Sequence, residues 1–246
     1  MDIKVLTLFP EMFSSFLNAS LIGRAIQNEI INVELINIRD FSNDKHKSVD
    51  DSPYGGGPGM VMTPQPLKDS IEFAKNKNNK VIFLTPKGKK FSQKIAKRLS
   101  TEEELILVCG HYEGIDQRIV DNYIDEEISI GDYVLTGGEL GAMVMIDAVA
   151  RLIPNVIGAK GSFEEDSHYN GLLDYPHYTR PQVFDDIKVP DVLLSGNHKE
   201  INNWREKEQI LSTFNKRPDM INKILSELDT NDKIYKKIKK VIEKNL

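Results

Sequence analysis

Cysteine is nearly absent from this 246-residue sequence, and long apolar runs are missing altogether. The single cysteine, Cys109, can form neither an internal disulfide nor a cysteine cluster for zinc. No apolar run reaches the roughly 18 residues of a membrane-spanning helix. The first residues, MDIKVLTLFP, lack the basic and apolar regions of a signal peptide. These absences disfavour secreted and membrane-bound classes and predict a cytoplasmic protein that contacts no membrane.

The common nucleotide-binding fingerprints are missing too. No G-x-G-x-x-G follows the first apolar stretch and no G-x-x-x-x-G-K-[ST] occurs, so a Rossmann dinucleotide site and a P-loop are both disfavoured. The net charge of −5 argues against a nonspecific coat for nucleic acid. The charge is uneven, because residues 1–170 hold 18 basic and 25 acidic side chains (−7) whereas residues 171–246 hold 14 and 12 (+2). This asymmetry fits one specific polyanion site better than a general one.

Apolar strands alternate with amphipathic helices over the first 157 residues. We expect strands at 3–9, 33–38, 80–85, 105–109 and 128–135, and helices near 12–17, 21–26, 64–74, 91–99, 117–123 and 140–153. Such alternation is typical of an α/β domain with a mostly parallel sheet flanked by helices. Residues 158–170, rich in glycine and acidic side chains, predict a flexible linker. Residues 171–246 predict a small, mainly helical domain, with helices beginning near Asn197, Pro218 and Asp232.

Three glycine-bearing turns follow strand ends, at residues 85–88, 110–114 and 131–138. Ligands of open α/β sheets bind at such ends, where glycine lets the backbone approach them closely. One such turn would be no more than a tight turn, but three in succession favour a binding site. A fourth glycine-rich run at residues 54–60 has the glycines of a phosphate cradle without its lysine, and fits a mobile lid equally well.

Polar candidates outside these turns are ambiguous by themselves. Asp166 lies in the linker, where a solvated charge is expected. Arg151 lies near the end of an apolar helix, a favourable place for any cation. His177, Tyr178 and Arg180 stand between prolines and fit either nucleic-acid contact or the cap of a domain boundary. The six lysines between residues 233 and 244 predict a solvated helix face.

Eight segments of the sequence together resemble one known protein family, although no single segment would be enough to identify it. In order along the chain they lie at residues 6–13, 50–62, 109–116, 128–140, 145–154, 165–167, 171–181 and 190–198. In these segments the sequence resembles the bacterial tRNA (guanine-N1)-methyltransferases of the SPOUT class. The resemblance implies S-adenosylmethionine-dependent methylation of the guanosine just 3′ of the anticodon. It also implies a parallel sheet whose C-terminal part forms a trefoil knot, a topology that residue patterns alone would not suggest.

The resemblance assigns residues as well as an activity. It places S-adenosylmethionine against the three turns, at Leu84, Thr85, Pro86, Gly110, Tyr112, Glu113, Gly114, Ser129, Ile130, Gly131, Asp132, Tyr133, Val134, Leu135, Gly137 and Gly138. It makes residues 1–157 the S-adenosylmethionine-binding domain and residues 171–246 the tRNA-binding domain. It places tRNA against Tyr54, Gly55, Gly56, Gly57, Gly59, Met60, Ser167, Asp174, His177, Tyr178 and Arg180.

Three of the implied residues carry the chemistry. Asp166 would be the general base for the guanine N1 proton, and Arg151 would stabilise the negative charge that builds toward O6. Glu113 would be a further contact to the base. The family forms homodimers with the active site between subunits. It benefits from Mg²⁺, for which no acidic cluster in the sequence identifies a site.

One departure and two alternatives accompany the resemblance. Gly141 stands where the family usually has proline, which predicts a looser cofactor pocket on that side. A SPOUT enzyme acting on ribosomal RNA is disfavoured by the linker and helical domain. A noncatalytic RNA-binding or S-adenosylmethionine-sensing protein would need neither Asp166 nor Arg151.

Overall fold

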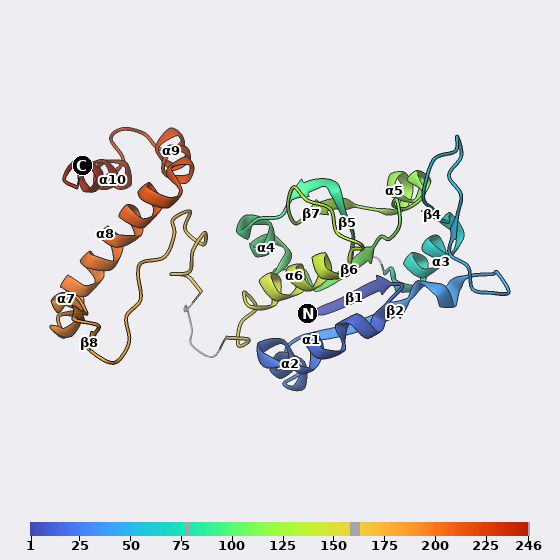
Figure 1. The fold of residues 1–246 in the computed structure, drawn as a ribbon, viewed down its shortest axis with the longest axis horizontal. Coiled ribbons are helices and arrows are strands. Elements are labelled where there is room, and N and C mark those ends of the chain that lie inside the picture. Colours follow the sequence, from blue (N-terminus) through green and yellow to red (C-terminus); the bar gives the residue numbers. More distant parts are fainter. Residues whose placement is uncertain (77–78, 158–162, 246) are drawn as a thin grey trace. The chain divides into compact units, whose positions relative to one another are not determined.

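The chain folds into two units, Met1–Lys160 and Gly161–Leu246, and each has its own apolar core. The computed structural model describes residues 1–76, 79–157 and 163–245 (Figure 1). Residues 158–162 of the predicted linker lie outside the described residues. Among the described residues, none of the helices has the length and apolarity needed to cross a bilayer.

A five-stranded parallel sheet forms the centre of the first unit, with strand order β2-β1-β6-β5-β7. Its strands are β1 (Asp2–Thr7), β2 (Asn32–Asn37), β5 (Lys80–Lys90), β6 (Glu104–Cys109) and β7 (Glu126–Ser129). The middle strands are apolar without alternation because both of their faces are covered. In β1, for example, Val5 and Leu6 point to opposite faces and are both fully buried. The prediction of an α/β unit with a parallel sheet is confirmed.

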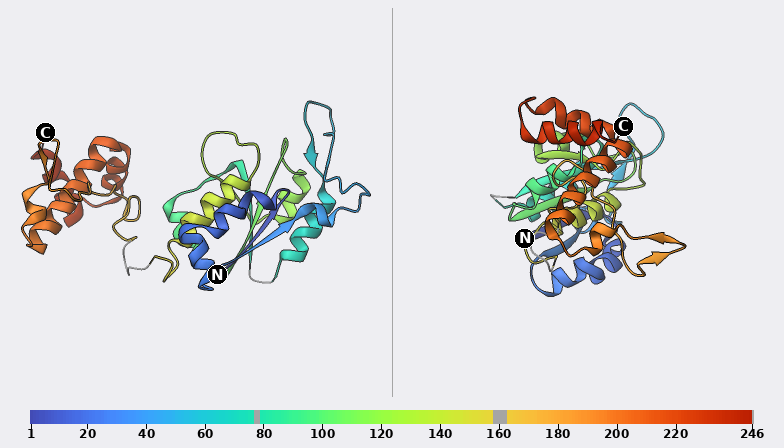
Figure 2. Two further views of the ribbon diagram at one scale, coloured as in Figure 1. Left: turned by 60° about the horizontal axis from the view of Figure 1, so that its bottom comes forward. Right: turned by 90° about the vertical axis from the view of Figure 1, so that its left-hand side faces the viewer.

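Helices cover both faces of this sheet (Figure 2). They are η1 (Pro10–Phe13), α1 (Ser14–Asn18), α2 (Ser20–Gln27), η2 (Ile38–Phe41), α3 (Pro64–Ala74), α4 (Gln93–Leu99), α5 (Gln117–Tyr123) and α6 (Glu139–Ala150). On one face, Leu67 of α3 and Ile119 of α5 share a cluster with Leu6 of β1. On the other, Met145 and Ile146 of α6 lie against the central strands. Alternate residues of one strand thus enter different cores.

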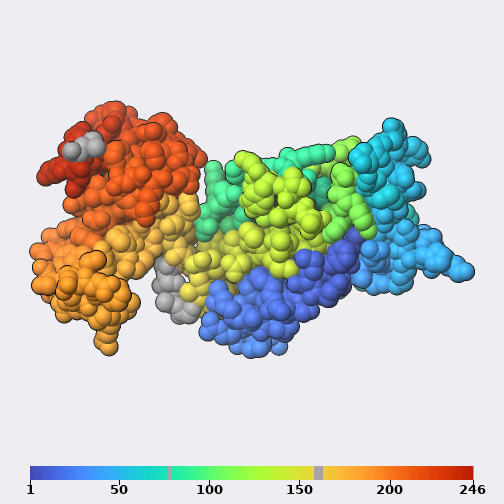
Figure 3. All heavy atoms as spheres, viewed as in Figure 1, coloured from blue at the N-terminus to red at the C-terminus, as the bar shows by residue number. Residues whose placement is uncertain are grey.

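Residues 42–60 form a projection at one end of the first unit, light blue to cyan in Figure 3. A short antiparallel pair, β3 (Asp50–Asp51) with β4 (Val61–Met62), closes its base. Tyr54 and the glycines that follow it are exposed at its tip. The absence of apolar periodicity over residues 39–63 therefore corresponds to a loop that places polar backbone in solvent.

Two strands end at clearly different residues in the structure than the sequence analysis predicts. The strand expected at 128–135 ends at Ser129, where the Gly131 N–H donates to Ser129 Oγ (3.2 Å) and turns the chain out of the sheet. The strand expected at 80–85 continues to Lys90 as β5. Ile128 of β7 pairs first with Leu84 and again with Lys89, so residues 85–88 form a bulge between the two pairings.

The second unit is mainly helical, as predicted. Its helices are α7 (Asp191–Leu194), α8 (His198–Lys216), α9 (Pro218–Glu227) and α10 (Lys233–Glu243). The Asn197 side chain caps α8 by accepting the Glu200 N–H. Ile210, Ile221, Ile238 and Ile242 form the core. A hairpin of β8 (Val183–Phe184) and β9 (Ile187–Lys188), together with the short α7, was not predicted, because two-residue strands carry no periodicity to detect.

Candidate active site

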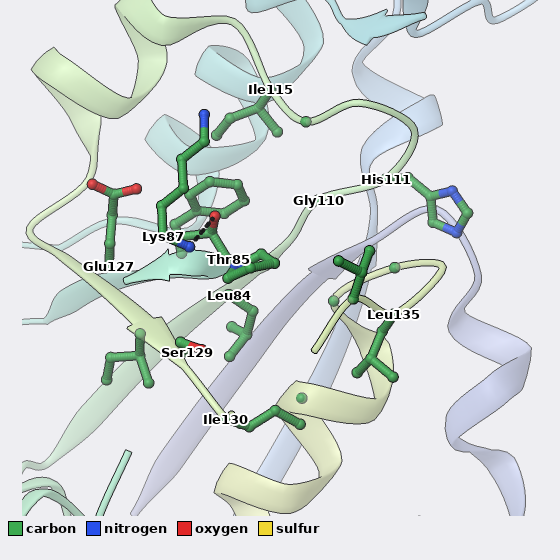
Figure 4. Close-up of a pocket in the computed structure, with 18 of the residues that line it drawn as sticks. Leu84, Thr85, Lys87, Gly110, His111, Ile115, Glu127, Ser129, Ile130 and Leu135 are labelled. Atoms are coloured by element: carbon green, nitrogen blue, oxygen red, sulfur yellow. Dashed lines mark hydrogen bonds between the residues drawn. The ribbon is translucent and has the colours of Figure 1, made fainter. Parts of the chain in front are cut away.

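One cavity of about 280 Å³ lies where the three glycine-bearing turns of the first unit meet (Figure 4). Its walls come from residues 83–87 of β5, residues 110–115 after β6, and residues 127–131 and 133–138 from β7 to the start of α6. In Figure 4, Leu84, Ile130 and Leu135 lie close together in its apolar part, while Glu127 and His111 stand at opposite sides. Three turns far apart in the sequence therefore form one site.

Nearly all of the cofactor residues implied by the resemblance line this cavity. Asp132 is the exception: its carboxylate is exposed and pairs with Lys90 Nζ at 3.0 Å. The sequence analysis missed several lining residues, among them Lys87, Gln117 and Glu127. Lys87 could have been suspected from its place inside a predicted turn. Glu127 had no such signal, because it lies within β7.

The turn after β6 is held in place by β4. The Glu113 N–H donates to Met60 O (3.0 Å), and the Met62 N–H donates to Gly114 O (3.0 Å). Gly114 has a φ of +127°, a conformation open to glycine. A Cβ on Gly59 would lie 2.5 Å from Glu113 Cγ, so the Glu113 side chain rests directly against Gly59. The structure thus joins two of the predicted regions, the glycine-rich loop and the Glu113 turn.

The segment after β7 returns to the end of β6. The Gly138 N–H donates to Gly110 O (2.9 Å), and Gly137 forms a bridge with His111. A Cβ on Gly138 would lie 2.7 Å from Cys109 Cα, so only glycine permits this approach. Gly141, one turn further, lines the cavity beside Leu84. The cavity closes because glycine backbone packs against backbone here.

A buried polar pair fixes the start of α6 to the end of β1. Thr7 Oγ1 donates to Glu139 Oε1 (2.8 Å) and accepts the Phe9 N–H (2.9 Å). Both Thr7 and Glu139 are buried. Burial, with a smaller contribution from the Glu139 carboxylate, raises the pKa of the Cys109 thiol far above its usual range. Cys109 therefore stays protonated at neutral pH and is no nucleophile.

The two principal catalytic candidates belong to different units. Arg151 is the C-terminal cap residue of α6 in the first unit and is half-buried. Asp166 is half-buried in a turn of the second unit, where its N–H donates to Phe163 O (3.3 Å) and its carbonyl accepts the Tyr169 N–H (3.1 Å). Glu113 belongs to the same unit as Arg151.

Several of the predicted tRNA residues cluster in the second unit. His177 Nε2 lies 2.7 Å from Asp174 Oδ2, and the Asp174 N–H donates to Ser167 Oγ (2.9 Å). Tyr178 packs against Trp204 with ring centroids 6.3 Å apart. Arg180 is exposed. The Asp166–Ser167 turn is therefore tied to the Asp174–His177 pair within one unit.

Tyr175 stands at the centre of this cluster and was not predicted. Its hydroxyl donates to Glu165 Oε2 (2.8 Å), and the Arg205 guanidinium lies 4.9 Å from the centre of its ring. Burial and the Glu165 carboxylate raise the pKa of Tyr175 to about 12. The hydroxyl thus remains a donor throughout the physiological range, and it anchors the segment that precedes Asp166.

A model of the tRNA (guanine-1)-methyltransferase family, TrmD, matches residues 1–223 of the chain. The chain belongs to this family. The tRNA (guanine-N(1)-)-methyltransferase of Alkaliphilus oremlandii (strain OhILAs) is 59% identical over 229 residues, which cover 90% of this chain and 92% of the relative. That of Clostridioides difficile (strain 630) is 56% identical over 227 residues, covering 91% and 98%. That of Clostridium botulinum (strain Hall) is 54% identical over 248 residues and covers both chains fully.

As a member of the tRNA (guanine-1)-methyltransferase family, the chain methylates guanine N1 in tRNA, with S-adenosylmethionine as the family's methyl donor. The resemblance drawn from its motifs is confirmed. The alternatives of a ribosomal RNA methyltransferase and of a noncatalytic RNA-binding or S-adenosylmethionine-sensing protein fall away.

Proposed function

We propose that the chain binds S-adenosylmethionine in the cavity of the three turns and methylates the guanosine just 3′ of the anticodon, with Asp166 as general base. The observation that carries this proposal is the convergence of the turns on one cavity of about 280 Å³ beside Glu113 and the glycine-rich loop. A site for a small organic ligand needs this combination of apolar walls and a few polar groups.

The residues present fit S-adenosylmethionine. Leu84, Ile130 and Leu135 offer apolar surface for a purine ring, and the glycine backbones offer N–H and C=O groups for the polar parts of the ligand. Lys87 and Glu127 supply one charge of each sign at the rim, matching a ligand that bears both an ammonium and a carboxylate. Bound there, S-adenosylmethionine supplies an electrophilic methyl group on a sulfonium centre.

The protein's own part is to handle a proton and a developing charge. Guanine N1 carries a proton and is a poor nucleophile until a base removes it. Asp166 accepts this proton as the new N–C bond forms. Negative charge then grows toward O6, where the fixed guanidinium of Arg151 stabilises it. Glu113, which rests on Gly59, holds the guanine edge beside the cavity.

A homodimer is part of the proposal. Arg151 belongs to the first unit and Asp166 to the second, and in the proposed dimer these two residues act from different chains. Met12, Leu140 and Val144 are exposed apolar side chains of the first unit, and the latter two lie one turn apart on α6. Apolar residues at this spacing form an unpartnered stripe that a second chain would cover.

The trefoil knot belongs to the proposal as well. β7 is the edge strand beside β5, yet the chain after it returns past β5 to Gly110 and then to Thr7 of β1. Between β5 and β6, the chain makes the bulge at 85–88 and α4. A return of this kind supports a threaded path. Mg²⁺ dependence stays a prediction, since the described part of the chain has no group of three metal-ligating side chains.

Transfer of labelled methyl from S-adenosylmethionine to tRNA transcripts tests the target position. Transcripts with guanosine 3′ of the anticodon should be methylated at N1, and matched transcripts with adenosine there should not. Equal labelling of both transcripts would refute the proposed position.

A further inference from the structure

Helix α10 carries a concentrated positive charge on an acidic protein. Residues 233–244 include six lysines and one glutamate, a net charge of +5. The whole chain has a net charge of −5, so the remaining residues sum to −10. The family model ends at residue 223 and leaves α10 out.

The helix separates its lysines from its apolar side chains. Ile238 and Ile242 are buried against Ile210 and Ile221 of the second unit. The opposite side is a continuous row of exposed residues spaced three or four apart, Lys233, Lys236, Lys237, Lys240 and Lys244. We call this row the lysine face. At 1.5 Å per residue it is about 16 Å long.

Among the described residues of the second unit, only one lysine of the lysine face has an acidic partner. Lys237 pairs with Glu206 of α8, and Glu243 is the only acidic residue among 233–244. Lys236 and Lys240 are one turn apart on α10, and like charges at that spacing destabilise a helix. A face of this kind is unfavourable for folding, and an external polyanion would relieve its repulsion.

We propose that the lysine face binds the phosphate backbone of the tRNA substrate. Lysine is a flexible point charge, suited to phosphates and not to planar recognition of base edges. A row about 16 Å long can face several successive phosphates of one strand. A membrane surface is a poorer fit, because an interfacial helix needs a free apolar side and that of α10 is buried in the core.

The proposal rests on tRNA being the substrate and adds affinity without specificity. Phosphate contacts position an RNA but carry no sequence information. The face should therefore strengthen binding of every tRNA alike, and this contribution should weaken with salt. Methyl transfer at saturating tRNA should not depend on it.

The test compares three double variants of the full chain. K236Q/K240Q removes two charges from the lysine face, and K236R/K240R keeps them. K68Q/K75Q makes the same change in net charge on α3 and at the residue that caps its C-terminus, where the two ammonium groups already face Glu72 and Asp125 (3.7 and 3.9 Å). Fluorescence anisotropy then gives the Kd for tRNA at several salt concentrations, with transcripts that have or lack the target guanosine.

For K236Q/K240Q we expect Kd to rise about 3- to 10-fold near 0.1 M salt, equally for both transcripts. The slope of log Kd against log salt should be shallower by about 1.4 to 1.8, since each phosphate contact contributes roughly 0.7 to 0.9. K236R/K240R should match the wild type, and KM for tRNA should rise at constant kcat.

An unchanged Kd and slope would overturn the proposal and leave α10 as a solvated helix. An equal loss of tRNA affinity in K68Q/K75Q would also overturn it, because the net charge of the protein would then explain the effect without the lysine face. A third outcome would also overturn the proposal and assign the lysine face to a membrane. In that case the wild type binds anionic phosphatidylserine vesicles, K236Q/K240Q does not, and both bind tRNA equally well. Because binding is measured without methyl transfer, a wrong target position would leave these results standing.

Discussion

Replacing Thr7 by valine tests whether the buried pair between β1 and α6 supports the cofactor cavity. Valine keeps the shape of threonine but lacks the hydroxyl that contacts both Glu139 and the Phe9 N–H. Glu139 is buried, so its carboxylate would lose a partner that water cannot readily replace. The matched control is Thr7→Ser, which keeps the hydroxyl and removes only a methyl group.

The expected magnitudes follow from these contacts. Leaving a buried carboxylate and a partly buried N–H unpaired costs about 2–4 kcal/mol in the free energy of unfolding. For a unit of this size that lowers Tm by roughly 5–15 °C. Thr7→Ser should cost only about 1 kcal/mol, the value of one buried methyl group. Gly137 and Gly138 line the cavity just before α6, so loosening the helix start should weaken S-adenosylmethionine binding about 3- to 10-fold, or about 0.7–1.4 kcal/mol.

Two spectroscopic signals separate the units. Trp204 is the only tryptophan and lies in the second unit, whereas far-UV circular dichroism reports both units. For Thr7→Val, the dichroism transition should move to lower denaturant while the Trp204 fluorescence transition stays in place. Calorimetry on the same preparation gives the affinity for S-adenosylmethionine. Equal stability and affinity of the valine and serine variants would refute the role given to the pair.

Three further predictions follow from the proposed site. Asp166→Asn should lower single-turnover methyl transfer by roughly 10²- to 10⁴-fold at unchanged S-adenosylmethionine affinity, because the turn keeps its backbone hydrogen bonds and the cavity lies in the other unit; a near-normal rate would remove Asp166 from the mechanism. Gly141→Pro should raise the free energy of unfolding by about 0.4–1 kcal/mol without weakening S-adenosylmethionine binding. The reason is that residue 141 precedes the first intrahelical hydrogen bond, from the Ala142 N–H to Gly138 O, so proline removes no bond of the helix. A large loss of S-adenosylmethionine affinity measured by calorimetry would contradict this. Mixing Arg151→Ala chains with Asp166→Ala chains should restore part of the activity if the residues act across subunits, while a fully active monomer in sedimentation at micromolar concentration would rule out a shared site.

Local patterns in the sequence were enough to place most of the elements. The helix expected at 64–74 is α3 (Pro64–Ala74), because a proline start and an apolar stripe are both local signals. The strand at 105–109 is β6, because an unbroken apolar run marks a strand covered on both faces. The prediction failed at 130–135, where no strand forms and all residues except Asp132 line the cavity instead. An apolar run therefore does not show by itself whether its residues join a sheet or line a cavity, and Tyr133 and Val134 are in fact exposed.

The candidate site divides in the same way. The sequence itself shows that glycine occurs in the turns at 85–88, 110–114 and 131–138. It also shows that each turn follows an apolar strand. That these turns enclose one cavity was implied by the resemblance, and strand order is what brings them together: β6 and β7 both flank β5. The contact of Glu113 with Gly59 likewise forms only because hydrogen bonds hold the chain at Met60 and Met62 against the turn at residues 113–114.

By itself, then, the sequence determined the class of most elements, the two-part organisation of charge and the chemistry available at each turn. These are properties of neighbouring residues, and short-range sterics and burial decide them. Only the tertiary structure decided which side chains meet. Thr7 and Glu139 are 132 residues apart and carry no mutual signal, yet packing α6 onto β1 makes their hydrogen bond the most favourable way to bury both. The turn at Asp132 shows the converse, since a residue inside a binding segment points to solvent once Ser129 and Gly131 bend the chain. Long-range pairing costs chain entropy that only a complete core repays, so it cannot be read from any one segment.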